Sequence, residues 1–164
     1  MKIKDIILNV KRGNFNEPEN FTQTDILCRD FFLSVSSFIE HNFTGAIEFH
    51  FPEKTEGFIT VSSYGFSYFL KLLLSEIYGN AVIKVSIEKE NDFIAVKINN
   101  ALPNNTDKIL SAARRSGFTV YEFPDGPLTL KAKIYPETQL TAYASSSLVF
   151  INYLYESFLC EYYE

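Results

Sequence analysis

The chain has 164 residues and a net charge of -5, and 16% of its residues are aromatic. A domain of this length can bury a hydrophobic core without disulfides or metals, and the aromatic share predicts a core rich in packed rings. The acidic balance argues against a nucleic-acid partner, because phosphate contacts need clustered Lys and Arg. Two Cys and two isolated His predict no metal site. Cys28 and Cys160 are interpreted as small buried hydrophobic residues.

The N-terminal residues do not predict membrane insertion. The start MKIKDIILNVKRG has an apolar run of only three residues, and no stretch reaches the roughly 18 apolar residues of a membrane span. We therefore expect a cytoplasmic protein. Residues 1–12 are expected to form a short amphipathic helix or an arm and residues 13–20 a linker. Residues 1–20 would then precede one domain at 21–164.

Periodicity and capping residues predict the elements of this domain. Helices are assigned where apolar residues recur every three to four positions, and strands where apolar and polar residues alternate. Thr24 is expected to cap the first helix, which reaches about Asn42. The other expected elements are strands 46–51 and 58–61, a helix from 62 or 63 through 78, strands 81–88 and 93–99, a helix 107–116, strands 118–123, 128–135 and 138–144, and a last helix after a cap at 145–147.

The order of these elements predicts the fold class. The charged turn at 89–92 joins two alternating strands, so an antiparallel hairpin is the natural pairing. Gly79 and Gly117 are expected to end their helices. We expect an α+β fold: a two-layer α/β sandwich with helices on one face of a mixed, mostly antiparallel sheet.

Five segments then follow one another in a familiar order: FTQTDILCRDFFLSVSSFIEH, GAIEFHF, GFITVSS, YGFSYFLKLLLSEIYGN and VIKVSIEKENDFIAVKINNA. Over residues 21–100 this order resembles the ATP-binding domain of bacterial sensor histidine kinases, in the histidine-kinase-like ATPase (GHKL) family that also includes gyrase. The resemblance is one of pattern rather than of signature residues. It therefore implies the fold far better than the activity.

The resemblance places magnesium-binding residues on the long helix that ends near residue 78. In the family this "N-box" helix supplies an Asn that coordinates magnesium and, in some branches, a Glu that activates water. One register keeps both as Glu76 and Asn80, on one face of the helix. The register that we favour, because Gly79 ends the helix before Asn80, sets Leu72 and Glu76 where two Asn would stand. Glu76 and Asn80 are then solvated residues of a helix end.

The resemblance also implies an adenine-binding Asp after the hairpin, followed by Gly. Here Asn100 and Ala101 follow the strand, and Asn100 either presents its amide oxygen to adenine or simply favours a turn. The family's lid is glycine-rich, so that backbone N–H groups hold the phosphates. Residues 101–116 contain no Gly, and Asp107 begins the next helix, where it would repel a triphosphate. Arg114 and Arg115 lie at the other end of that helix.

Neither histidine is placed to accept phosphate, since His41 lies near a helix end and His50 on a strand, opposite the core. The two-helix hairpin that carries the phosphoacceptor is expected to be absent. We therefore expect no catalytic residue, no metal ligand and no bound cofactor.

These expectations describe a degenerate, pseudo-kinase domain acting through protein contacts in a two-component system, with a signalling kinase or response regulator as partner. If the chain is instead a divergent but working module, Glu76, Asn80 and Asn100 are expected to hold Mg-ATP. A third interpretation is an unrelated α+β interaction domain. Aromatic residues in the last helix leave a homodimer open.

Overall fold

The computed structural model describes residues 17–52, 54–79, 82–99, 106–122, 127–140 and 152. The predicted helix or arm at 1–12, Cys160 and the predicted last helix, apart from Asn152, lie outside these residues. The expected division between residues 20 and 21 stays a prediction. The elements are strands β1 (Thr24–Leu27), β2 (Glu48–His50), β3 (Phe58–Val61), β4 (Lys84–Glu90), β5 (Phe93–Asn99), β6 (Thr119–Tyr121) and β7 (Leu128–Lys133), helices α2 (Cys28–Asn42), α3 (Ser63–Gly79) and α4 (Thr106–Ser116), and a 3-10 turn η1 (Glu137–Gln139).

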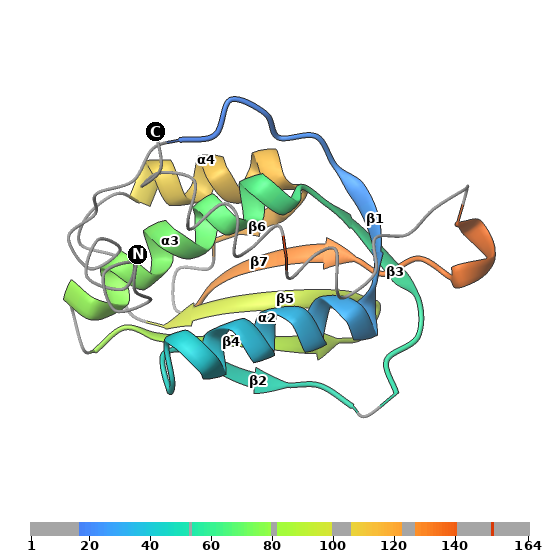
Figure 1. Ribbon diagram of the computed structural model, residues 1–164, viewed down its shortest axis with the longest axis horizontal. Helices are drawn as coiled ribbons and strands as arrows, with labels where there is room; N and C mark the ends of the chain where they lie inside the picture. The colour runs from blue at the N-terminus through green and yellow to red at the C-terminus, as the bar shows by residue number, and fades with distance from the viewer. Residues whose placement is uncertain are drawn as a thin grey trace.

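The described strands form two sheets. The larger has the order β2-β4-β5-β7-β6, with β2 parallel to β4 and every other pair antiparallel. The smaller is the antiparallel pair β1-β3. The three helices lie together over one face of the larger sheet (Figure 1). The predicted fold class, a two-layer α+β sandwich with a mixed, mostly antiparallel sheet, is confirmed.

Alternation along the strands gives the larger sheet one apolar face and one polar face. Ile87 of β4 lies opposite Val96 of β5, which lies opposite Leu130 of β7, and all three are fully buried. One residue along, Glu88, Ala95 and Lys131 form the corresponding row on the other face. The helices cover the apolar face, and the charged side chains remain on the polar one.

Aromatic rings hold the helices against each other and against the sheet. Phe31 of α2 meets Phe66 of α3 edge to face at 5.1 Å, and Phe66 stacks against Phe118, just before β6, at 5.8 Å. Phe31 and Phe66 are fully buried, and each contributes about 1.5–3 kcal/mol by leaving water. The predicted ring-rich core is confirmed.

The start of the first helix was predicted wrongly. Residues 24–27 form β1, which pairs with β3 in a register that sets Thr24 opposite Val61, and α2 begins only at Cys28. Leu27 is extended, and the Cys28 N–H donates to the Gly57 carbonyl at 2.9 Å. Pairing with a strand more than thirty residues away therefore overrides the local helix signal of Thr24.

Other boundaries follow local signals more closely. The Gly65 N–H donates to Ser62 Oγ at 3.0 Å, so Ser62 is the predicted N-cap of α3. The predicted hairpin is present, with a tighter turn in which Asn91 has a φ of 53°. The strand predicted at 138–144 is wrong at its start, because Glu137–Gln139 forms η1, and residues 141–144 lie outside the described part. Strands 46–51 and 118–123 are shortened to β2 and β6.

Candidate nucleotide site

Three elements that the sequence singled out lie at the same end of the domain: the end of α3, the start of α4 and the end of β5 (Figure 1). The Ser62 N–H donates to the Ser116 carbonyl at 2.9 Å, so the start of α3 lies beside the end of α4. The two helices run side by side in opposite directions, and the end of α3 therefore lies near the start of α4 (Figure 1). β5 ends on the same side of the molecule (Figure 1). This end of the domain is the candidate nucleotide site.

Glu76 lies at this end, within the last turn and a half of α3. Its exposed fraction is 5%, so the interpretation of Glu76 as part of a solvated helix end is wrong. Leu72, one turn earlier, is 3% exposed. A buried carboxylate requires polar or charged contacts, since burial in an apolar environment disfavours its ionised form. Asn80, the other residue predicted on this helix, lies outside the described residues.

A second buried charge on α3, that of Lys71, was not predicted from the sequence. Lys71 is 3% exposed although it stands in the apolar run of α3 from Phe66 to Leu74. A lysine inside such a run was the available signal, because Lys is almost never fully buried unless it is paired. Lys71 and Glu76 make α3 a helix with two buried ionisable groups.

The start of α4 carries a negative charge. Asp107 lies in its first turn and is exposed. The N–H groups of a helix start attract anions, and a carboxylate in the first turn already uses part of that field. The side chain of Asp107 would also repel a triphosphate bound there.

The two arginines of α4 lie at its far end, as predicted. Arg115 Nη1 is 2.6 Å from Glu17 Oε1, and its guanidinium carbon lies 3.8 Å from the centre of the Phe21 ring. Arg115 thus fastens the segment ahead of β1 onto α4. About nine residues of helix, or roughly 14 Å, separate it from the start of α4.

The predicted adenine-binding residue cannot be placed. Asn99 ends β5, opposite Lys84, while Asn100 and residues 101–105 lie outside the described residues. Of the three predicted site residues, Glu76 alone therefore has a described position.

The remaining reactive side chains lie elsewhere in the described chain. His41 is exposed in the last turn of α2, and His50 Nε2 lies 3.3 Å from Glu48 Oε2 on the edge strand β2. Burial raises the pKa of the Cys28 thiol to about 12, so it stays protonated at neutral pH and is a poor nucleophile. Within the described residues, no group of three or more His, Cys, Asp or Glu could hold a metal ion. No helix of that same part is long and apolar enough to cross a bilayer.

No family model matches the chain, and no curated protein matches it significantly. Several solved structures of histidine kinases match the chain. The cytoplasmic segment of the histidine kinase QseC is 16% identical, with 84% of this chain and 97% of that chain covered and a TM-score of 0.40. The Acinetobacter baumannii histidine kinase AdeS is 13% identical, over 80% of this chain and 75% of that chain, with a TM-score of 0.43. The catalytic domain of the histidine kinase ThkA is 17% identical, over 72% and 99%, with a TM-score of 0.36.

All three structures come from histidine kinases, the class of protein that the sequence resembles. At these identities and TM-scores, the likeness carries no conclusion about what the chain binds or does.

Proposed function

We propose that this chain is a histidine-kinase-like domain whose ATP turnover is lost or strongly impaired, and that it acts through protein contacts in two-component-type signalling. The order of elements supports the comparison with such domains. One observation carries the proposed loss of activity: the first turn of α4 holds Asp107, and no glycine lies between Asn100 and this helix.

The expected loss of nucleotide affinity follows from the hydrogen bonds that the family's lid donates to the phosphates. A nucleotide bound with a micromolar Kd gains about 8 kcal/mol, and a hydrogen bond to a charged phosphate contributes about 1.5–3 kcal/mol. Loss of two or three backbone N–H donors is therefore enough to move the Kd into the millimolar range. Repulsion by Asp107 acts in the same direction.

The burial of Glu76 favours a second candidate, a divergent module that still binds Mg-ATP. A carboxylate is a ligand that magnesium accepts, and Glu76 lies at the end of α3 where the family holds its metal. This candidate also requires Asn80 and Asn100 to converge on the same pocket.

A calorimetric titration with Mg-ATP separates the two candidates. The proposal predicts no saturable heat at nucleotide concentrations below about 1 mM, because too few phosphate donors remain. Saturable micromolar binding that Glu76→Gln weakens at least about tenfold, with an unchanged circular dichroism spectrum, would establish the second candidate instead. Micromolar binding that Glu76→Gln leaves unchanged would also overturn the proposal.

A further inference from the structure

A cavity of about 530 Å³ lies on the polar side of the larger sheet, away from the candidate nucleotide site. Phe58 of β3, Phe93 of β5 and Tyr135 after β7 are its aromatic walls. Lys131 and Lys133 of β7 supply its charged groups. Its volume lies in the range of small-molecule sites, which runs from about 300 to 1,000 Å³.

Backbone hydrogen bonds fix the walls of this cavity. The Phe58 N–H donates to the Tyr135 carbonyl at 2.9 Å, and the Tyr135 N–H donates to the Phe58 carbonyl at 2.8 Å. Phe93 lies directly opposite Lys133 in the pairing of β5 with β7. A cavity built on paired strands needs little ordering when a ligand enters, which favours binding.

The charge of the cavity is opposite to that of the chain. The chain carries more acidic than basic residues, with 20 Asp and Glu against 15 Lys and Arg. None of the described residues that line the cavity is acidic, and two are lysines. Charge complementarity therefore favours an anionic ligand.

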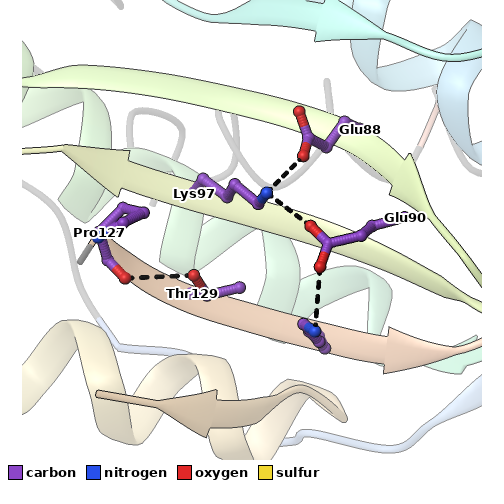
Figure 2. A network of polar contacts seen from close by, with 6 residues as sticks. Glu88, Glu90, Lys97, Pro127 and Thr129 are labelled. Carbon is purple, nitrogen blue, oxygen red and sulfur yellow. Dashed lines mark hydrogen bonds and ion pairs between the residues drawn. The ribbon is translucent and has the colours of Figure 1, made fainter. Parts of the chain in front are cut away.

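One of the two lysines already has a partner. Lys131 Nζ lies 3.2 Å from Glu90 Oε1, and Lys97 Nζ lies 2.5 Å from Glu90 Oε2 and 2.7 Å from Glu88 Oε1. Figure 2 shows Lys97 between the two glutamates. Two carboxylates thus balance two ammonium groups across β4, β5 and β7. Lys131 brings little uncompensated charge to the cavity.

Among the described residues that line the cavity, Lys133 is the cation without a carboxylate partner, and it is exposed. It forms no ion pair with any carboxylate of the described residues, and its ammonium nitrogen lies 5.5 Å from the centre of the Tyr135 ring. This position puts one positive charge beside an aromatic wall. A ligand that matches both features carries one negative charge on a flat apolar body.

We propose that this cavity binds a small organic monoanion with an aromatic body, such as an aromatic carboxylate. The carboxylate meets Lys133, and the ring packs among Phe58, Phe93 and Tyr135. A polyphosphate fits the cavity poorly, because a single uncompensated lysine cannot balance several negative charges. The proposal is independent of the function proposed above, since it uses neither α3 nor α4.

Three probes of one shape and different charge test this assignment: benzoate, benzamide and benzamidinium. Each is titrated into ¹⁵N-labelled full chain, and the amide chemical shifts are followed. A one-ring ligand of this size binds with a roughly millimolar Kd. We expect saturable shifts with benzoate at the amides of Phe58, Phe93 and Lys133, weaker binding of benzamide, and the weakest binding of benzamidinium.

The matched variants are Lys133→Gln and Lys108→Gln, which remove the same charge from the cavity and from an exposed position on α4. Lys133→Gln is expected to weaken benzoate binding about two- to fivefold, the range for an exposed ion pair, and to abolish the preference over benzamide. Lys108→Gln should leave the affinity for benzoate and the preference over benzamide unchanged. Equal affinity for the three probes, no saturable shift with benzoate, or equal loss in the two variants would each overturn the proposal.

Discussion

Gly65, in the first turn of α3, occupies a position where the size of one side chain decides the fit. A Cβ atom added there would lie 2.5 Å from Phe21 Cδ1 and 2.6 Å from Ser116 Oγ. Phe21 in turn lies against the guanidinium of Arg115. The segment ahead of β1 is therefore held in a slot between α3 and the end of α4, and the slot exists because residue 65 has no side chain.

Gly65→Ala is expected to destabilise the domain by about 1–3 kcal/mol, because the added methyl group overpacks this slot. A loss of stability would be informative, because Gly→Ala inside a helix normally stabilises a protein by about 0.5–1 kcal/mol. Urea unfolding measures the difference. In a Phe21→Ala background only part of the penalty should disappear, because Ser116 Oγ still lies against the added methyl group. A Gly65→Ala protein as stable as the parent would refute the slot.

At the scale of elements, four charged side chains on the polar face of the larger sheet join three strands. They are Glu88 and Glu90 of β4, Lys97 of β5 and Lys131 of β7. Hydrogen bonds from Lys97 and Lys131 lower the pKa of the Glu90 carboxyl below its ordinary value of 4.5. The lowered pKa means that this carboxylate stabilises the fold above pH 4.5, and that the contribution is lost as pH falls through the lower, folded-state pKa.

Unfolding by urea between pH 7 and pH 3 tests this network. The parent protein should lose more stability than Glu90→Gln over the acidic part of this range, because the amide has no proton to gain. Glu40→Gln, at an exposed position on α2, is the matched control and should follow the parent. Parallel pH curves for the parent and Glu90→Gln would show that the network contributes nothing.

Elements with local signals were predictable from the sequence, and those with distant partners were not. The N-cap Ser62 and the alternation of β4 and β5 lie within the elements that they define, so α3 and the hairpin were placed closely. β1 depends on its pairing with β3, and a run such as Thr24–Leu27 fits either a helix or a strand until that partner is known. The 3-10 turn at Glu137 follows Pro136, which also permits the extended chain that was predicted.

At the scale of the whole molecule, the helix that carries Glu76 was predictable from the sequence, and the burial of its side chain was not. Apolar periodicity and the N-cap at Ser62 predicted the helix that contains Glu76, and the structure places this residue in α3. Its burial depends on how α3 packs in the helix layer, which no local pattern encodes. Lys71 was missed although its place within an apolar run was a local signal, and Asn80 and Asn100 stay predictions.

A triphosphate would need bare backbone amides in the space between the end of α3 and the start of α4. Crystals of the full chain soaked with magnesium and a non-hydrolysable ATP analogue at about 1 mM, well above a micromolar Kd, examine that space directly. We expect no ordered nucleotide there. Ordered triphosphate density beside Glu76 and against the first turn of α4 would contradict the account.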